Sequence, residues 1–396
     1  MLRRLRVKNF QSIRDEVEVS LLLNARAPSD FRTLKTIDEQ KATKVLALIG
    51  ANGSGKTNVL KTLAFLHWFI KDSFIGLKPE DPIPVSPHFA NQEHPIEFEL
   101  EFELQGKIWL YQLTLNEQQV LHESLYRKDY RFVYIFKRDW DEQAQSYVIK
   151  LKDEFDFSLK EAQKVRLNAS LIATAAQYGQ SLATQLTQLN VRTNLTMMGK
   201  YSFSDFEQLL TAAETVQQQP ELLQKLSRLL ANWDLGLSEV RIKQEQVTDK
   251  AGNKQTLYIP MGLHQVDDQS YELMLWQESS GTRSAFVLLS KLLPILQAGG
   301  LVVIDELESD LHPHMLAAIL DLFFVPEINQ HNAQLIFSTH SHEVLNMLCK
   351  EQIVLVEKDA ELSTEAYRLD EVEGIRADDN IYAKYMAGAY GAIPEI

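Results

Sequence analysis

The chain has 396 residues, of which 45% are hydrophobic and 24% are charged, a composition typical of one large or two ordinary globular domains. Its net charge of -14 argues against a surface that binds nucleic acid chiefly through Lys and Arg, although a local basic face is compatible with it. The single cysteine, Cys349, excludes an internal disulfide and a multi-cysteine zinc site, and the sequence shows neither a membrane-spanning apolar run nor a signal peptide, so we expect a cytoplasmic protein.

Two strands are predicted at the start of the chain, over residues 2–10 and 17–23, and we expect them to pair. The first strand alternates apolar residues with four basic ones: Arg3, Arg4, Arg6 and Lys8. These side chains form one solvated strand edge or, as a less favoured alternative, part of a basic face. The polar stretch 24–44 is predicted to be loop. An apolar run over 45–49 then ends in a glycine cluster, which indicates a buried strand followed by a helix over 56–69.

The middle of the chain changes its periodicity twice. Residues 79–95 contain five prolines and are predicted to be a long exposed connection. Apolar and polar residues then alternate over 96–151, which predicts an antiparallel meander with one face in solvent. From 159 to 233 the spacing becomes helical, without the alternation typical of strands. This stretch is too short and too aperiodic for a long coiled coil, so we expect a compact helical module.

The last part of the chain alternates strands and helices. Strands are predicted over 240–276, joined by a hairpin at 250–253, and a helix is predicted over 282–296. Three short apolar strands follow, at 301–304, 334–338 and 353–357. Two helices separate them, at 313–324 and 343–348. This alternation favours a parallel or mixed sheet between layers of helices.

The segment Gly50-Ala-Asn-Gly-Ser-Gly-Lys-Thr matches the whole P-loop pattern and stands between a buried strand and a helix, as the motif requires. Its glycines let backbone N–H groups curl around phosphate oxygens, and the helix N-terminus adds its positive end. We expect Lys56 to reach the β- and γ-phosphates of ATP and the Thr57 hydroxyl to ligate Mg²⁺. A glycine-rich turn with a chance lysine is the much weaker alternative. The candidate nucleotide-binding residues are Gly50, Asn52, Gly53, Ser54, Gly55, Lys56, Thr57 and Asn58.

Two acids, Asp305 and Glu306, stand at the exit of the predicted strand 301–304. Ligands bind at the carboxyl ends of strands in such sheets. Asp305 therefore fits the carboxylate that holds Mg²⁺, and Glu306 fits the group that orients or deprotonates water. The alternative is that the two acids only cap the following helix. For this motif by itself the two interpretations would be equally good, but the P-loop upstream favours the magnesium-binding one.

Two further segments are candidates for contacts with phosphate because of where they stand relative to the predicted strands and helices. His340 follows the strand 334–338, where a histidine can contact a γ-phosphate, although a lone histidine is more often structural. The segment Ser279-Ser-Gly-Thr-Arg-Ser precedes a helix, and small hydroxyls with a glycine at a helix start make an anion site. Considered alone, this segment would more simply be an ordinary serine N-cap.

Together these motifs resemble the ABC-type ATPase heads of the SMC, Rad and RecF group, and in particular the short prokaryotic AAA ATPases of anti-phage and abortive-infection loci. The resemblance extends to the opening segment Val7-Lys-Asn-Phe-Gln-Ser, to Glu308-Ser-Asp-Leu-His-Pro and to the ending from Asp378 to Pro394. It spans nearly the whole chain and is strongest over 1–70 and 273–345. It implies an α/β fold with a mixed central sheet flanked by helices, an antiparallel β meander and an inserted helical module.

The resemblance also implies a role for each motif. Asp305 and Glu306 correspond to the Walker B pair, with Glu306 the catalytic base, and His340 corresponds to the switch histidine. Ser280 and Gly281 correspond to the signature core, which contacts the γ-phosphate bound on the opposite subunit of a homodimer that sandwiches ATP. Two residues depart from the usual signature, which has a glycine and a glutamine there: Thr282 and Arg283. Two residues lie in the segment expected to cross the dimer interface: Ser309 and Asp310.

We therefore expect an N-terminal ATPase lobe over 1–155, a helical module over 156–235 and a C-terminal ATPase lobe over 236–396. With ATP and Mg²⁺ as cofactors, the dimer would act as a switch that controls a separately encoded effector, a nuclease or toxin, in phage defence. Nucleic acid would be reached through that effector, and no membrane partner is expected. One alternative is a DNA-repair or DNA-clamping ATPase, against which the acidic balance and the missing coiled coil count. Another is a nucleotide-binding scaffold with little turnover, against which Glu306 counts.

Overall fold

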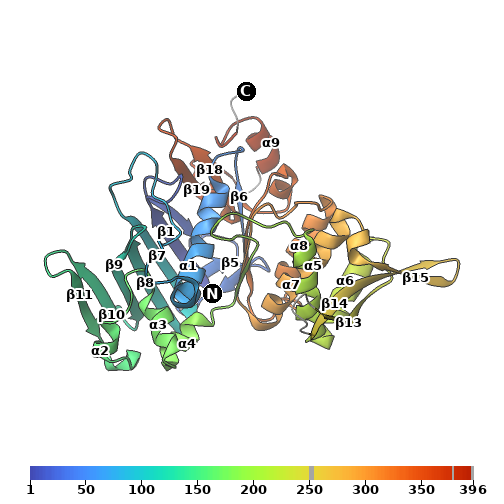
Figure 1. The fold of residues 1–396 in the computed structure, drawn as a ribbon. Coiled ribbons are helices and arrows are strands. Elements are labelled where there is room, and N and C mark those ends of the chain that lie inside the picture. The colour runs from blue at the N-terminus through green and yellow to red at the C-terminus, as the bar shows by residue number, and fades with distance from the viewer. Residues whose placement is uncertain (249–253, 377–378, 394–396) are drawn as a thin grey trace.

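The computed structural model describes residues 1–248, 254–376 and 379–393 (Figure 1). The hairpin predicted at 250–253 lies outside the described residues, as do Asp378 and Pro394 of the ending segment. Within the described ranges, no helix combines the length and the apolar character that a membrane crossing requires.

A mixed sheet runs through the centre of the molecule (Figure 1). Among the described residues its strand order is β12-β16-β17-β6-β18-β19, and every neighbouring pair is parallel except β18 with β19. The strands are β6 (Val45–Ile49), β12 (Val191–Thr193), β16 (Leu301–Ile304), β17 (Gln334–Ser338), β18 (Ile353–Lys358) and β19 (Thr364–Arg368). The apolar runs predicted to be buried strands are confirmed, and they are apolar throughout because layers cover both faces of the sheet.

Alternate side chains of the central strands enter two separate hydrophobic cores. In β6, Leu46 and Leu48 pack into one core, whereas Ala47 and Ile49 pack into the other, because successive side chains of a strand point to opposite faces. Helices of the first core are α1 (Lys56–Gly76), α3 (Leu171–Gln177) and α4 (Ser181–Thr187). Helices of the second core are α5 (Phe206–Gln217), α6 (Pro220–Asn232), α7 (Ser280–Ala298) and α8 (His314–Phe324). The helices predicted over 159–233 are present, and they divide between the two cores.

The predicted meander is confirmed, and the first two strands extend it. Within the described ranges these strands make one seven-stranded antiparallel sheet in the order β11-β10-β9-β8-β7-β1-β2. Its strands are β1 (Leu2–Lys8), β2 (Val17–Ser20), β7 (Ile96–Leu104), β8 (Lys107–Leu115), β9 (Val120–Lys128), β10 (Phe132–Asp141) and β11 (Ser146–Leu151). The short helix α2 (Leu159–Ala162) contacts β11. The pairing of β1 with β7 places Leu5 opposite Leu100 in the first core.

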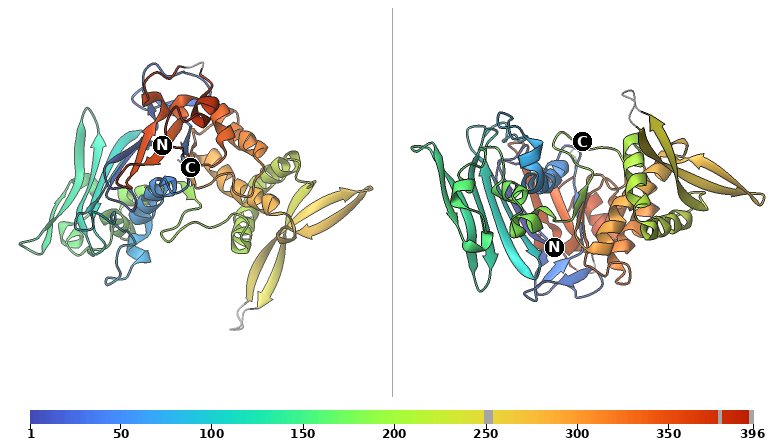
Figure 2. Two further views of the ribbon diagram at one scale, coloured as in Figure 1. Left: turned by 90° about the horizontal axis from the view of Figure 1, so that it is seen from above. Right: turned by 60° about the horizontal axis from the view of Figure 1, so that its bottom comes forward.

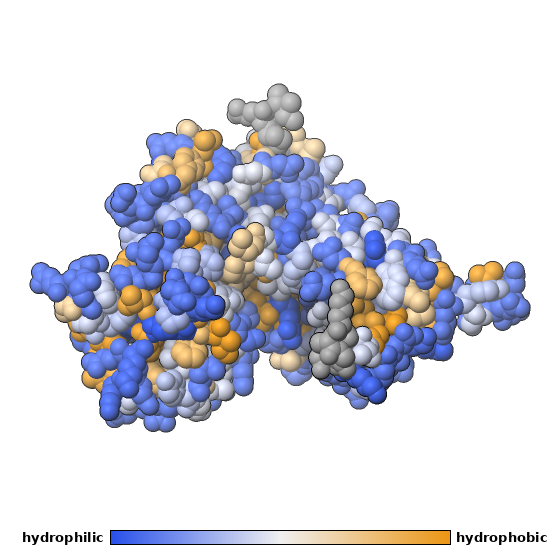
Figure 3. Space-filling view, viewed as in Figure 1, coloured by the Kyte–Doolittle hydropathy of each residue, from blue (hydrophilic) through white to orange (hydrophobic). Residues whose placement is uncertain are grey.

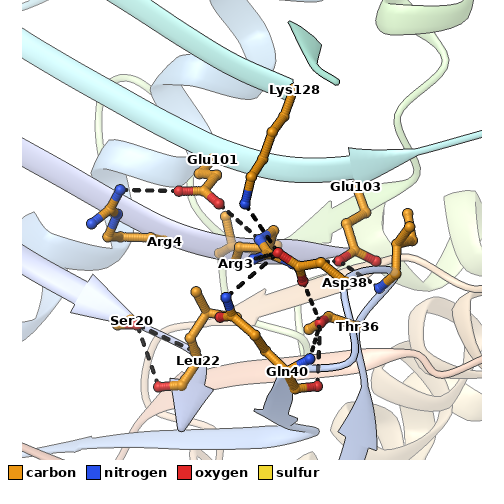
Figure 4. A network of polar contacts seen from close by, with 12 residues as sticks. Arg3, Arg4, Ser20, Leu22, Thr36, Asp38, Gln40, Glu101, Glu103 and Lys128 are labelled. Carbon is orange, nitrogen blue, oxygen red and sulfur yellow. Dashed lines mark hydrogen bonds and ion pairs between the residues drawn. The ribbon is translucent and has the colours of Figure 1, made fainter. Parts of the chain in front are cut away.

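Arg3 is buried rather than solvated, which corrects the prediction for this residue. Its guanidinium donates to Glu101 at 2.8 Å, to Glu103 at 2.6 Å and to Asp38 at 2.9 Å (Figure 4). The network ties β1 to β7 and to the segment before β5. The other two arginines of the strand are also paired: Arg4 with Glu101, and Arg6 with Glu18. Acidic neighbours therefore offset the positive charge of these three arginines, which favours the structural interpretation over a basic face.

Short strands appear where the sequence pattern predicted loop or helix. The stretch 24–44, predicted to be loop, contains β4 (Thr33–Lys35) and β5 (Lys41–Thr43), which form a small sheet with β3 (Leu22–Leu23). β12 lies inside the stretch predicted to be helical, and β19 follows the last predicted strand. Strands this short are stabilised mainly by their pairing partners, so they leave little periodicity in the sequence. The helix predicted near 343–348 is a short 3₁₀ helix at His342–Asn346.

A further sheet projects beside the second core. It consists of β13 (Glu239–Thr248), β14 (Lys254–Val266) and β15 (Gln269–Met274), paired in antiparallel order, and Figures 1 and 2 show its hairpins extending away from the body. The last helix of the described residues is α9 (Ile381–Met386). Figure 3 shows that hydrophilic residues cover most of the visible face, with apolar residues scattered among them.

Candidate nucleotide-binding site

A cleft of about 660 Å³ opens where β6 and β16 end. It is lined by Ser12, Asn52, Gly53, Gly55, Lys56, Thr57, Asn58, Asp305, Glu306 and His340. Thr57 and Asp305 are 248 residues apart in the chain, yet their side chains are hydrogen-bonded. They meet because β16, β17 and β6 are parallel neighbours, which places the segments that follow these strands at one edge of the sheet.

The P-loop is held tightly by the strand β19. Gly55 has a φ of 109°, and a Cβ at this position would lie 2.1 Å from the Thr364 hydroxyl, so only glycine fits. That hydroxyl donates to the carbonyl oxygen of Ser54 at 2.9 Å. Ser54 and Gly50 are not among the residues that line the cleft, and their role in binding nucleotide stays a prediction.

Lys56 is a buried cation at the floor of the cleft, with a 6% exposed fraction. Its ammonium donates to the carbonyl oxygens of Gly50 at 2.8 Å and of Ala51 at 2.9 Å. Burial lowers the pKa of Lys56, and the nearby carboxylates of Asp305 and Glu306 act in the opposite direction. The lysine is therefore held at the foot of the loop, within the field of the two acids.

Asp305 is 2% exposed and accepts hydrogen bonds from two hydroxyls. Thr57 donates to its two carboxylate oxygens at 3.1 and 3.0 Å, and Ser338 donates to one of them at 2.6 Å. A hydroxyl and a carboxylate are hard oxygen donors, which Mg²⁺ prefers, and Mg²⁺ normally completes its shell with phosphate oxygens and water. In the described part of the chain no cluster of three His, Cys, Asp or Glu side chains forms a ready metal cage. The donor set of Thr57 and Asp305 therefore fits a Mg²⁺ ion that arrives with a nucleotide.

Glu306 has an unusual backbone and a well-defined side chain. Its φ of 54° lies in the left-handed region, and its N–H donates to the Ser338 hydroxyl at 2.8 Å. One carboxylate oxygen, Oε2, contacts the Lys200 ammonium at 2.5 Å and accepts from the Ser309 hydroxyl at 3.2 Å. The other, Oε1, lies 3.8 Å from Nε2 of His340. Burial acts to raise the pKa of Glu306, but Lys200, Ser309 and His340 together outweigh it and the pKa is lowered, so the carboxylate is ionised.

The structure adds residues that the sequence analysis missed. Asn194, directly after β12, bonds both backbone groups of Asp305, each at 2.9 Å. Lys200 comes from the same segment, which was predicted to be helical and so gave no signal. Glu308 accepts from the backbone N–H of His340 at 2.5 Å. The sequence analysis included Glu308 in the segment Glu308-Ser-Asp-Leu-His-Pro but gave it no role.

The signature residues stand apart from the cleft. Ser280 and Gly281 begin α7 and are not among the residues that line it. The Ser279 hydroxyl accepts from the backbone N–H of Thr282 at 3.1 Å, so the simple N-cap alternative is correct for Ser279. A Cβ on Gly281 would lie 2.9 Å from the carbonyl oxygen of Asp310, which packs the signature against the segment expected at the dimer interface. The role of Ser280 and Gly281 towards a nucleotide stays a prediction.

Comparison with known proteins agrees with this geometry. Residues 45–346 match the sequence model of the family described as "AAA domain, putative AbiEii toxin, Type IV TA system". This range contains the P-loop, the signature segment, Asp305, Glu306 and His340. No curated protein matches the chain.

Solved structures of SMC heads are similar in fold. An SMC head bound to the C-winged helix domain of ScpA is 12% identical, with a TM-score of 0.50, over 94% of this chain and 99% of that one. The SMC head domain from Thermotoga maritima is 14% identical, with a TM-score of 0.44, over 93% and 98%. An SMC head from Pyrococcus furiosus, bound to the C-terminal domain of ScpA, is 12% identical, with a TM-score of 0.46, over 93% and 97%. The expected α/β fold of an ABC-type ATPase head is confirmed by the first of these similarities.

Proposed function

The chain belongs to the family of AAA domains described as a putative AbiEii toxin of a type IV toxin–antitoxin system, and we propose that it hydrolyses ATP as a dimeric switch controlling a separately encoded effector. Family and fold support a P-loop ATPase of the ABC and SMC type. The observation that carries the proposal of hydrolysis is the cleft, which gathers the P-loop, the pair Asp305 and Glu306, and His340.

Binding of ATP follows from the charges at the floor of the cleft. The Lys56 ammonium and the N–H groups at the start of α1 face the β- and γ-phosphates, whose negative charge they offset. Thr57 and Asp305 would hold Mg²⁺, which would neutralise part of the charge of the phosphates. Asn194 and Ser338 keep Asp305 in place for this task through the hydrogen bonds already described.

Hydrolysis requires a base beside the γ-phosphate. The Glu306 carboxylate accepts a proton from water as the water oxygen bonds to the γ-phosphorus, and the bond from that phosphorus to the bridging oxygen breaks to release ADP. His340 lies on the side of the Glu306 oxygen that is not bonded to Lys200 or Ser309, where it donates to the γ-phosphate. Loss of that phosphate removes the contact and so signals turnover.

Ser280 and Gly281 serve the cleft of a second copy in this proposal. The Ser280 side chain is exposed at the N-terminus of α7 and away from the cleft of its own chain, which supports a contact made across a dimer. The helix N-terminus would then face the γ-phosphate bound by the partner. ATP binds the closed dimer better than the open one, so hydrolysis shifts the population back to the open form.

A protein partner is supported by two comparisons. The family description names a toxin of a type IV toxin–antitoxin system, and one similar SMC head is bound by the C-winged helix domain of ScpA. We infer that the dimer holds a nuclease or toxin in phage defence and that any nucleic acid is reached through this effector. The ion pairs of Arg3, Arg4 and Arg6 count against direct DNA clamping through the first strand.

Substitution of the base tests the proposal. Glu306→Gln preserves the shape of the side chain but cannot accept the proton, so we expect turnover to fall by about 10²–10⁴-fold while ATP still binds. Phosphate release measures turnover, and size-exclusion chromatography with Mg²⁺ and ATP should show more dimer than with the parental protein. Turnover at the parental rate would show that another residue is the base, and a parental protein without ATP turnover would overturn the proposed hydrolysis.

A further inference from the structure

A tight turn after β12 carries a lysine to the two acids of the cleft. β12 lies at the edge of the central sheet, parallel to β16, so its end lies beside Asp305. Asn194 fixes this junction by bonding both backbone groups of Asp305 at 2.9 Å. The chain then reverses, and Leu195 pairs with Lys200 in an isolated antiparallel bridge. The turn therefore places Lys200 beside Asp305 and Glu306, although Lys200 belongs neither to the P-loop nor to β16 or β17.

The base of the turn is anchored on both sides. The Tyr201 hydroxyl donates to the carbonyl oxygen of Thr193 at 2.5 Å, and the Lys291 ammonium lies 5.0 Å from the centre of the Tyr201 ring. Phe203, which follows, is buried in the second core. Lys200 thus stands at the anchored base of this turn, whose tip at Met198 is exposed, and its own side chain has a 35% exposed fraction.

The two carboxylate oxygens of Glu306 have different surroundings, because Lys200 contacts only one of them. Oε2 is held by the Lys200 ammonium at 2.5 Å and by the Ser309 hydroxyl at 3.2 Å. Oε1 has neither contact and points towards His340, at 3.8 Å from Nε2. The same ammonium lies 3.7 Å from Asp305, so it also reduces the repulsion between the two neighbouring carboxylates.

We propose that Lys200 is a positioning residue for ATP hydrolysis, which with Ser309 fixes Oε2 of Glu306 so that Oε1 is the oxygen that receives the proton from water. The inference rests on the proposed function, in which Glu306 is the base. A carboxylate held at one oxygen presents the other in one direction, and fixing a reacting group in this way contributes to the rate without contributing to substrate affinity. Lys200 is supplied by the middle segment, so a partner that moves this segment would alter turnover.

Replacement of the ammonium by a neutral side chain of similar length tests the inference. We expect Lys200→Met to lower kcat by about 10²-fold, the size of effect that a small misplacement of a catalytic group produces. The dissociation constant of ATP, measured with Mg²⁺ in a Glu306→Gln background, should stay within about twofold. Lys200→Arg, which keeps a cationic donor, should retain most of the parental kcat. Ser309→Ala should lower kcat by a smaller factor than Lys200→Met does. The control is Lys35→Met, a change at an exposed lysine, and thermal unfolding midpoints check that each variant is folded.

A double-mutant cycle separates this role from a merely structural one. If Lys200 acts through Glu306, Lys200→Met should cause no further loss of turnover in the Glu306→Gln protein. The inference is overturned if Lys200→Met keeps the parental kcat or exceeds it, if it weakens ATP binding while kcat at saturation is kept, or if the loss persists in the Glu306→Gln background. Failure of the proposed function would look different, because then the parental protein itself would not hydrolyse ATP.

Discussion

At the scale of single residues, hydrogen bonds within the protein hold the charged side chains of the cleft in position. Lys56 donates to two carbonyl oxygens of its own loop, and Asp305 accepts from Thr57 and Ser338. Each contact leaves further donor or acceptor capacity, because an ammonium has three protons and a carboxylate has about four lone-pair sites. This remaining capacity is what the proposed binding of phosphate and metal would use.

Lys56→Ala should weaken the binding of ATP. Each hydrogen bond from the ammonium to a phosphate oxygen contributes about 1.5–3 kcal/mol, so its loss should raise the dissociation constant by about 10- to 150-fold. Equilibrium binding of ATP in Mg²⁺ measures the effect, and Lys71→Ala on the exposed face of α1 is the matched control. Unchanged affinity in the Lys56→Ala protein would contradict the P-loop assignment.

At the scale of elements, a buried carboxylate joins the seven-stranded sheet to the helices beside it. Glu123 on β9 is fully buried and accepts from the Tyr111 hydroxyl at 2.9 Å and from the Ser170 hydroxyl at 2.7 Å. It also accepts from the backbone N–H of Leu171 at 2.9 Å, so it caps α3. Arg138 on β10, also fully buried, lies 3.5 Å from it. The charge pair and the helix cap together fix α3 against the sheet, next to the C-terminal end of α1, where the Ser170 N–H donates to the Ser73 hydroxyl at 3.0 Å.

Glu123→Ala should lower the free energy of unfolding by about 3–5 kcal/mol, because removing one member of a buried ion pair leaves the other charge uncompensated. Urea unfolding followed by fluorescence measures this change. The exposed Glu97→Ala on β7 should change stability by at most about 0.5 kcal/mol. A loss as small as that of the control would mean that Glu123 is not coupled to Arg138 and α3 as described.

At the scale of the whole molecule, the cleft and the signature segment lie on different parts of the chain. The P-loop belongs to the side of the central sheet that α1 covers, whereas Ser280 begins α7 in the second core. One chain thus carries two surfaces that do not meet each other, which is the arrangement needed for a symmetric dimer with two shared sites.

Mixing two inactive variants tests whether the sites are shared. Lys56→Ala and Ser280→Arg should each be inactive as homodimers, and ATP turnover should reappear when subunits exchange. In the mixed dimer one site combines both lesions, while the other combines an intact P-loop with an intact signature. Phosphate release and nucleotide trapping are measured together, with subunit exchange verified by labelled chains. If exchange occurs and neither signal returns, the shared-site arrangement is wrong.

Local sequence was sufficient for the motifs because their chemistry lies in consecutive residues. The strand over 45–49, the P-loop and the start of α1 form one continuous segment, and Asp305 and Glu306 directly follow their own strand. An apolar run followed by glycines, or by two acids, is a signal that needs no knowledge of distant residues. For the same reason the meander was predictable from its alternation, and the buried strands of the central sheet from their apolar runs.

Only the tertiary structure decided which elements become neighbours. Pairing places β1 beside β7 and brings β12 to the edge of the central sheet, although a three-residue strand carries no periodicity of its own. The position of β12 is what brings Asn194 and Lys200 to Asp305 and Glu306. The partner of a charged side chain depends on where a distant segment of the backbone lies, and that position follows from the burial of apolar residues throughout both cores. The motifs of this protein could therefore be predicted from its sequence, whereas Asn194 and Lys200, which contact Asp305 and Glu306, could be found only in the folded chain.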